Sequence, residues 1–278
     1  MIRSIFIIFL SAVSAFAVEP LQWPATPRGL GLGGALVALA DDPQTGIVNP
    51  AGVLFLKRIG YDLSFATSTA DEPDHFSTTF VNPGTEQGSS LGMGFWTQGL
   101  SENRDAVYYV PYTGTAWNPA GIASLGLTTR FPYLKSGVDS VESRWEAIGD
   151  LALLKAFGHL RFGATVERTF GGSSLVPRLL HAGAAFSSSG ITFAYEWRGD
   201  ETARKFDFHY ASSHWGAEID AGKYASLRAG YISAEFTRLA FGAALGLKPA
   251  GWRTQFTWEV PPSGTGPTRW SVGLAYRS

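Results

Sequence analysis

Apolar and polar residues alternate along most of the chain after about residue 60. The segment 252–260, WRTQFTWEV, places Trp, Thr, Phe, Trp and Val at even positions and Arg, Gln, Thr and Glu at odd positions. Segments 191–198, 160–167 and 205–210 show the same alternation. A period of two residues is typical of strands with one apolar face and one polar face. The pattern therefore predicts an all-β fold from residue 59 to residue 278.

The strand pattern recurs in fifteen segments. They are 60–68, 74–82, 88–98, 105–112, 121–131, 144–155, 158–169, 178–187, 190–198, 203–210, 213–221, 224–233, 237–247, 251–260 and 268–277. A bacterial barrel with both ends on one side of the membrane needs an even number of strands. The apolar phase changes between 206–210 and 215–219, as a β-bulge near Ser212–Ser213 would produce. Treating 203–221 as one bulged strand predicts about 14 strands.

Two architectures accommodate such strands. A soluble β-sandwich buries the apolar faces, whereas an outer-membrane barrel turns them toward lipid and lines its lumen with the polar faces. Trp and Tyr on the apolar faces, Gly and Ala on the polar faces, and segments of roughly 9–11 residues favour an antiparallel transmembrane β-barrel. Tight connections at 156–157 and 188–189 fit periplasmic turns, and long ones at 132–143 and 170–177 fit extracellular loops.

Composition narrows the function classes. Charged residues make up 16% of the 278 residues, well below the roughly 25% of soluble domains, while aromatic residues reach 14%. The net charge of −1 gives no basic footprint, so no nucleic-acid partner is expected. Because the chain has no cysteine, disulfides, thiolate metal sites and thiol nucleophiles are excluded.

The first residues predict the compartment. Arg3 precedes the apolar run SIFIIFLSAVSAFA, which ends on the small-residue cleavage pattern Ala15-Phe16-Ala17. This arrangement is typical of a secretory signal peptide, and the run is too short for a membrane span. Residues 1–17 are therefore expected to be removed near Ala17, and the cell outer membrane is the expected location of the mature barrel.

The stretch from Gly29 to Asp42, GLGLGGALVALADD, has the glycine spacing of a dinucleotide-binding loop. Such a loop follows a buried strand and precedes an acidic residue by roughly 20 positions. Upstream lies EPLQWPATPR with three prolines, and residues 53–57 contain no acid. Nucleotide binding is therefore not expected, and no cofactor is predicted.

The run GGALVALADD, residues 33–42, is followed by the turn NPAG, residues 49–52. Together they resemble the N-terminal signature of FadL-like and PorV/PorQ-like outer-membrane proteins. The order of WGAEIDAGKYASLRAGY, LAFGAALGLKP and the last strand RWSVGLAYR is also similar to that family. The resemblance implies that residues 18–58 form a short helical plug inside the lumen of a barrel built from residues 59–278.

Plug and gating residues follow from the same resemblance. They are expected to be Gly33, Gly34, Asp41, Asp42, Asn49, Pro50 and Gly52. Small residues would allow the plug to pack closely against the wall, and Asp41 and Asn49 could cap short turns. Rearrangement around residues 46–52 would open a path through the lumen.

Charged side chains on the polar faces are expected to line the lumen. They are Arg161, Glu167, Glu196, Arg198, Lys205, Asp207, Arg253 and Glu259. The carboxylates could serve acid–base chemistry, but ion pairs across the lumen are favoured. His209 and His214 would share a face only through the bulge, and neither a metal site nor an enzyme is predicted.

The resemblance implies a passive outer-membrane transporter of small hydrophobic molecules. A non-transport role, as a PorV/PorQ-like component or partner of an outer-membrane secretion machine, stays open as the alternative. A soluble periplasmic β-protein is the third possibility. The expected partners are outer-membrane lipid and either hydrophobic small molecules or secretion-system proteins.

Overall fold

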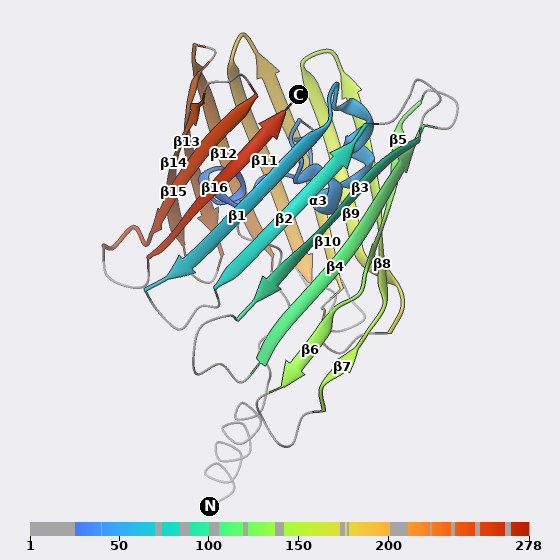
Figure 1. Ribbon diagram of the computed structural model, residues 1–278. Helices are drawn as coiled ribbons and strands as arrows, with labels where there is room; N and C mark the ends of the chain where they lie inside the picture. Colours follow the sequence, from blue (N-terminus) through green and yellow to red (C-terminus); the bar gives the residue numbers. More distant parts are fainter. Residues whose placement is uncertain are drawn as a thin grey trace, which may run out of the picture.

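The computed structural model describes fourteen ranges of the chain. They are residues 26–39, 41–69, 74–83, 89–99, 106–118, 122–136, 142–172, 176, 178–200, 211–222, 224–234, 237–247, 251–264 and 268–277. Within them, long tilted strands wrap into a barrel that encloses short helices (Figure 1). No helix in these ranges is long and apolar enough to cross a membrane.

Sixteen strands and three short helices are described. The strands are β1 (Gly60–Ser68), β2 (His75–Asn82), β3 (Ser89–Gln98), β4 (Ala106–Trp117), β5 (Ser124–Arg130), β6 (Tyr133–Ser136), β7 (Arg144–Trp145), β8 (Ile148–Phe157), β9 (Leu160–Phe170), β10 (Leu179–Ser188), β11 (Ile191–Asp200), β12 (Ser212–Ala221), β13 (Ala225–Ser233), β14 (Arg238–Gly246), β15 (Trp252–Val260) and β16 (Arg269–Arg277). The helices are α2 (Pro27–Gly31), α3 (Thr45–Val48) and the 3₁₀ helix η1 (Pro50–Phe55).

Fourteen of these strands close the barrel. Each pairs antiparallel with its neighbour along the chain, β5 pairs with β8, and β1 pairs with β16 to complete the ring. The predicted antiparallel barrel of about 14 strands is confirmed. β6 and β7 lie outside the ring as an extension on β4.

The extension falls within and just after residues 132–143, which the sequence pattern predicted to be a loop. β5 ends at Arg130 because Phe131 leads into Pro132, and a proline has no N–H to donate to a ladder. β4 is longer than β5. The first residues of β4, 106–109, therefore have no partner in β5 and pair with β6 instead. The segment predicted as one strand at 144–155 accordingly divides into β7 and β8.

The described part of β12 contains no β-bulge near Ser212–Ser213, where one was expected. β12 pairs with β11 in regular register from Ser212 opposite Arg198 to Ile219 opposite Ile191. Residues 203–210, which were expected to continue this strand, lie outside the described residues. An irregularity occurs instead between β8 and β9, where Gly149 pairs with Phe170 but Leu151 pairs with Val166. Two additional residues on β9 fill this interval.

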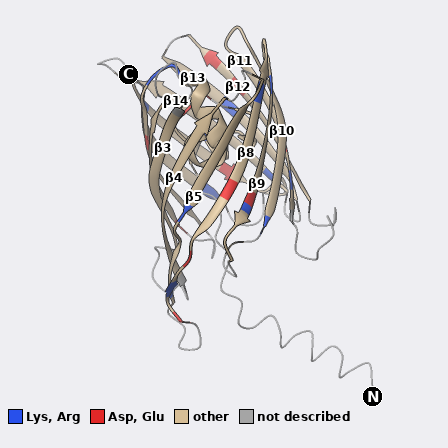
Figure 2. Ribbon diagram, turned by 90° about the vertical axis from the view of Figure 1, so that its right-hand side faces the viewer, with Lys and Arg blue, Asp and Glu red and all other residues tan. Residues whose placement is uncertain are grey.

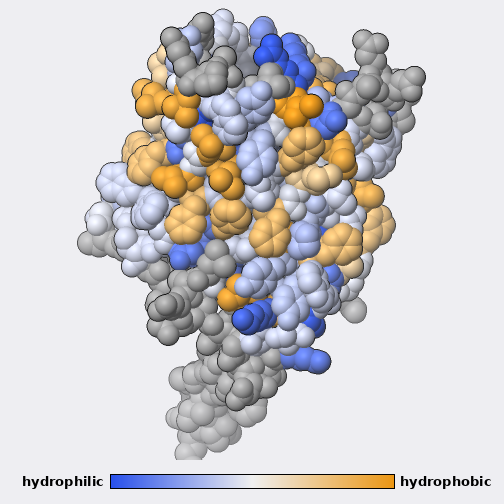
Figure 3. Space-filling model, viewed as in Figure 1, coloured by the Kyte–Doolittle hydropathy of each residue, from blue (hydrophilic) through white to orange (hydrophobic). Residues whose placement is uncertain are grey.

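The two faces of the wall differ as the alternation predicted. Outward positions carry exposed apolar side chains such as Phe193, Trp215 and Phe241, whereas inward positions are buried and mostly small, polar or charged. Few ribbon segments of the strands carry acidic or basic residues (Figure 2). Apolar side chains gather over the middle of the wall, and the strongly hydrophilic ones lie mainly toward its ends (Figure 3). The outer surface therefore suits a hydrocarbon environment.

The two ends of the barrel differ in their connections. Tight turns at 158–159 and 189–190 lie at the end where β1 begins and β16 finishes, which we call the turn end. The opposite end, called the loop end, carries the longer connections and the β6–β7 extension (Figure 1). Short turns on the side of the chain termini are typical of outer-membrane barrels.

Candidate functional site

The segment from Thr26 to Phe55, here called the plug, lies inside the barrel. Its helices are short, and most of its described residues are buried. Pro27 opens α2, where proline is favoured, and the Thr26 hydroxyl accepts a hydrogen bond from the Gly29 N–H at 3.3 Å. Gly33 and Gly34 then adopt positive φ angles of 61° and 84°, which end the helix and turn the chain.

Inward-facing glycines of the wall let the plug backbone approach closely. A side chain at Gly230 would overlap Gly33, and one at Gly163 would overlap the Val37 carbonyl. The same applies to Gly216 against Leu32 and, for the second half of the plug, to wall glycines at 92, 114 and 126. Glycine lacks the Cβ that would separate two backbones, so these positions define the surface on which the plug rests.

Arg28 connects both ends of the first plug segment to the wall. Its guanidinium donates to Asp41 at 2.5 Å, to Asp42 at 2.7 Å and to Glu218 of β12 at 3.0 Å. Glu218 in turn pairs with Arg228 of β13. Burial alone would lower the pKa of Arg28, but Asp41, Glu218 and Asp42 together raise its pKa well above the ordinary value. Arg28 therefore remains a cation in its buried position.

Glu196 of β11 holds the turn that follows Gly34. One of its carboxylate oxygens accepts hydrogen bonds from the N–H groups of Leu36 and Val37, each at 2.8 Å. Arg198 donates to the other oxygen at 2.7 Å and to the Gly34 carbonyl at 2.6 Å. The wall thus binds exposed plug N–H and C=O groups that a regular helix would have satisfied internally.

A row of buried charges continues from Glu196 around the wall. His181 places one ring nitrogen 2.9 Å from Glu196 and the other 2.7 Å from Glu167. Arg130 donates to Glu167 at 2.8 Å and to Asp150 at 2.6 Å. A histidine between two carboxylates suits the imidazolium form, in which both ring nitrogens donate. The row crosses β5, β8, β9, β10 and β11 as one connected network.

The second half of the plug is held by neutral hydrogen bonds. The Asn49 amide donates to the carbonyls of Val37 at 2.7 Å and Leu153 at 3.1 Å. Ser124 donates to the Ala51 carbonyl at 2.5 Å, and Thr165 donates to the Val48 carbonyl at 3.1 Å. Among the described contacts, no ion pair involves residues 45–55.

Of the two predicted turn caps, the one at Asn49 is wrong. Asp41 pairs with Arg28, and Asp42 accepts from the Gln44 N–H at 3.0 Å instead. Asn49 precedes η1 but makes no side-chain cap: its Nδ2 donates to the Val37 and Leu153 carbonyls, and its Oδ1, the atom that would accept in a cap, has no partner among the described residues. Pro50 opens η1 directly after α3 has ended at Val48, and Gly52 lies buried within η1.

The predicted luminal charges differ from one another in their ion-pair partners and in their places along the barrel. Glu196 pairs with Arg198, but Glu167 pairs with Arg130 and His181, and Glu259 pairs with Arg238 at 3.2 Å. Arg161 and Arg253 lie at inward positions of the turn end. Lys205 and Asp207 lie outside the described residues, as does His209. His214 donates to the Gly33 carbonyl, and no group of three metal-ligating side chains is found within the described ranges.

Several anchoring residues were missed from the sequence. Glu218 and Arg228 follow the same alternation as the predicted charges and could have been found by it. Arg130, Asp150 and His181 also occupy inward positions of strands. Arg28 carries no such signal, because its partners lie 13, 14 and 190 positions away along the chain.

An apolar cluster fills another part of the lumen and was not predicted. Trp96 of β3 and Tyr112 of β4 are buried, with ring centroids 5.8 Å apart. Their cluster also includes Tyr108, Val110, Leu134, Ile148 and Val176 on the barrel side and Leu36, Leu39, Ile47 and Val48 on the plug side. β4 carries apolar residues on both faces, so its sequence, AVYYVPYTGTAW, could have indicated an apolar luminal position.

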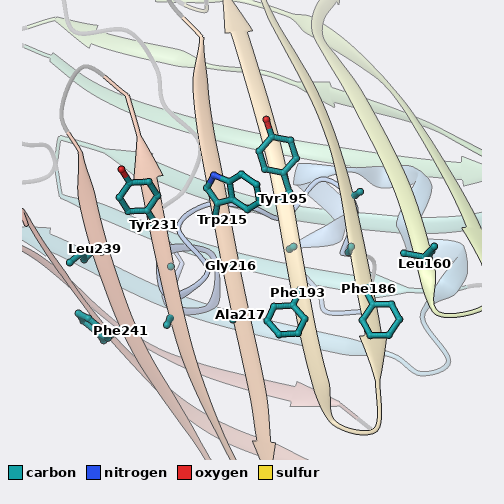
Figure 4. A pocket seen from close by; sticks show the side chains of 15 residues that line it. Leu160, Phe186, Phe193, Tyr195, Trp215, Gly216, Ala217, Tyr231, Leu239 and Phe241 are labelled. Carbon is teal, nitrogen blue, oxygen red and sulfur yellow. The ribbon is translucent and has the colours of Figure 1, made fainter.

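The outer wall carries a shallow apolar depression of about 570 Å³ across β9–β14. Its floor includes Ala217 and Ala229, which are paired across β12 and β13. In Figure 4, Tyr195, Trp215 and Tyr231 form a row on one side, while Phe193 and Phe241 lie on the other side. The adjacent inward residues are Gly216 and Gly230, so only backbone and two methyl groups separate the plug from the outside here. The ladder between the two strands is continuous.

The fold has solved counterparts, although no family model matches the sequence and no curated protein matches it. The CymD monoaromatic hydrocarbon channel is 14% identical, with a TM-score of 0.70 over 92% of this chain and 97% of that chain. The Pseudomonas putida toluene transporter TodX is 12% identical, with a TM-score of 0.65 over 94% and 99% of the two chains. A Pseudomonas aeruginosa FadL homologue is 9% identical, with a TM-score of 0.62 over 94% and 99%. At these identities the likeness shows a shared FadL-like barrel fold.

Proposed function

We propose that the protein is an outer-membrane channel for the passive passage of small hydrophobic molecules. The barrel exterior supports a membrane location, and the neighbours in fold include proteins named as hydrocarbon channels and toluene transporters. The observation that carries the proposal is the apolar luminal cluster around Trp96 and Tyr112. A lumen serving only water-soluble solutes has no need of a buried aromatic surface.

Passage requires the plug to move, because plug and wall are in contact on both sides of the lumen. The first half of the plug is fixed by Arg28 and by the bonds to Glu196. The second half, around residues 46–52, is held by neutral hydrogen bonds and faces the apolar cluster. Neutral hydrogen bonds contribute roughly half as much as bonds to charged groups, so this half is the proposed moving part.

Uptake of radiolabelled toluene by intact Gram-negative cells tests the proposal, because the lipopolysaccharide leaflet slows hydrophobic solutes. Cells that express the protein should accumulate toluene faster than cells that express a plug-locked variant. The lock is Gly46→Cys with Gly92→Cys, since a Cβ at Gly92 would lie 3.0 Å from the Cα of Gly46. The chain has no other cysteine, so oxidation links only this pair.

Uptake by the oxidised variant should fall to that of cells without the protein and recover on reduction. Each single-cysteine variant is the control and should transport in both redox states. Equal uptake by oxidised and reduced double variant would refute movement around residues 46–52. Equal uptake by cells with and without the wild-type protein would refute the channel.

A second candidate is a non-transport component of an outer-membrane secretion machine, as in PorV/PorQ-like proteins. The observation that favours it is a lumen occupied by the plug within a wall whose described ladders close the ring. In that case cross-linking in cells should capture secretion-system proteins, and the Gly46–Gly92 lock should leave secretion unchanged. N-terminal sequencing of the mature protein tests the proposed signal peptide, residues 1–17, and gives the start of the proposed plug segment, residues 18–58.

A further inference from the structure

A pocket of about 260 Å³ opens at the turn end, between the plug and the barrel wall. Three cationic residues line it: Lys57 and Arg58, which follow η1, and Arg161 at the start of β9. Apolar side chains of Phe55, Leu56 and Val81 form another part of its lining. The pocket therefore combines positive charge with an apolar surface.

Arg161, which lines this pocket, has an unused donor. Its Nη1 is buried and makes no hydrogen bond within the described part of the chain. A buried guanidinium N–H without a partner is costly, and an anionic oxygen would satisfy it. Lys57 and Arg58 are exposed and belong to none of the ion pairs found among the described residues.

Two carboxylates in the lining form no ion pair with these cations among the described contacts. Asp41 accepts from Arg28 at 2.5 Å and 3.2 Å, and Asp42 accepts from Arg28 at 2.7 Å. Asp42 also accepts from the Gln44 N–H with its other oxygen. Both acids are thus engaged on the side of Arg28, and three cations remain for a ligand.

We propose that this pocket, here called the mouth pocket, binds small aromatic carboxylates. The carboxylate would accept from Arg161, with Lys57 and Arg58 adding attraction, while the ring lies against Phe55 and Leu56. Drug-sized ligands occupy pockets of about 300–1,000 Å³, so 260 Å³ suits a molecule with one ring and excludes a long acyl chain. Bidentate geometry makes arginine well matched to a carboxylate.

The role of the mouth pocket rests on the proposed channel function. If the turn end faces the periplasm, as the short turns favour, the pocket lies where a solute would leave the lumen. It would then favour aromatic acids over neutral aromatic molecules of the same size. Binding itself does not depend on transport and can be measured on the purified protein.

Equilibrium dialysis with radiolabelled benzoate and benzyl alcohol tests the inference on the full chain in detergent at low salt. Wild-type protein should bind benzoate more tightly than benzyl alcohol. Arg161→Gln should weaken benzoate binding about tenfold or more and leave benzyl alcohol binding unchanged. The matched control is Arg253→Gln, which removes an inward cation at the same end but outside the pocket, and benzoate binding should stay within twofold.

A double variant, Lys57→Gln with Arg58→Gln, changes only exposed side chains and keeps the test valid if Arg161→Gln does not fold. It should weaken benzoate binding severalfold, and added salt should reduce the difference. The inference is overturned if benzoate binds no more tightly than benzyl alcohol, if inorganic phosphate competes as well as benzoate, or if Arg253→Gln weakens benzoate binding equally. If cells with and without the wild-type protein take up toluene equally while the purified protein still binds benzoate more tightly than benzyl alcohol, the channel is refuted but the mouth pocket is not.

Discussion

Replacing Arg28 by glutamine should release the first half of the plug while the barrel stays closed. Arg28 is 3% exposed and makes five hydrogen bonds to three carboxylates. Glutamine is shorter and neutral, so it cannot bridge Asp41, Asp42 and Glu218 at once. Glu218 keeps Arg228 as a partner, whereas Asp42 is left buried without its cation.

The magnitude follows from the burial of this group. Removing one partner of a buried ion pair typically costs about 3–5 kcal/mol. Asp41 lies toward the low end of that range, because its side chain is 33% exposed and water can solvate it. A loss of about 3 kcal/mol corresponds to roughly a hundredfold weaker docking of the plug. The barrel ladders contain no Arg28 bond, so their stability should change much less.

Hydrogen exchange measured by mass spectrometry is the assay. Amides of residues 30–39 should lose protection by about two powers of ten in Arg28→Gln, while those of β13 and β15 should be nearly unchanged. The control is Arg144→Gln, because Arg144 pairs with Glu146 but is 40% exposed, and such pairs contribute about 0–1 kcal/mol. Unchanged protection in the plug, or equal loss in plug and barrel, would refute the anchoring role.

Titration of Arg28 itself should not make the effect of Arg28→Gln depend on pH. A cation whose pKa is raised in the folded state contributes its full stabilisation below the unfolded pKa. That contribution is lost only as the pH rises through the folded pKa, which for Arg28 lies well above the ordinary value of an arginine. The exchange difference from wild type should therefore be constant between about pH 7 and pH 9, and a decline with rising pH would contradict this.

Three further substitutions test the packing of wall and plug. Gly230→Val should force the plug backbone away and cost about 1–3 kcal/mol, seen as increased plug exchange; unchanged exchange would refute close packing. Ala217→Arg places a charge on the apolar outer wall and should lower the free energy of unfolding in lipid by about 2–4 kcal/mol. The control, Ile122→Arg in a turn-end connection, should lower it by about 0–1 kcal/mol. Equal losses of stability would contradict a lipid-facing depression. Trp96→Ala should lower the free energy of unfolding by about 3–5 kcal/mol and reduce toluene uptake. The control Trp145→Ala should change both quantities little, because Trp145 is 62% exposed. Unaltered uptake in Trp96→Ala would argue against the apolar cluster as the route.

Much of the wall could be predicted because alternation is a local property. Each residue of a barrel strand faces either the lumen or the outside, so the period of two in 191–198 and 252–260 gave both the strands and their faces. The expected bulge near Ser212–Ser213 was wrong because β12 keeps a regular register with β11 from Ser212 onward. The β6–β7 extension was missed because short strands after Pro132 carry too few residues to show a period.

The sequence by itself determined the existence of the plug but not its contacts with the wall. Its existence came from the run GGALVALADD and the turn NPAG, and the left-handed turn at Gly33–Gly34 agrees with the residues found there. The partners of Arg28, Glu196 and Asn49 came only from the tertiary structure, because contacts between segments up to 190 positions apart leave no periodic trace in one sequence. The apolar luminal cluster and the Arg161 donor that has no partner among the described residues were likewise decided by how fourteen strands wrap around one short segment.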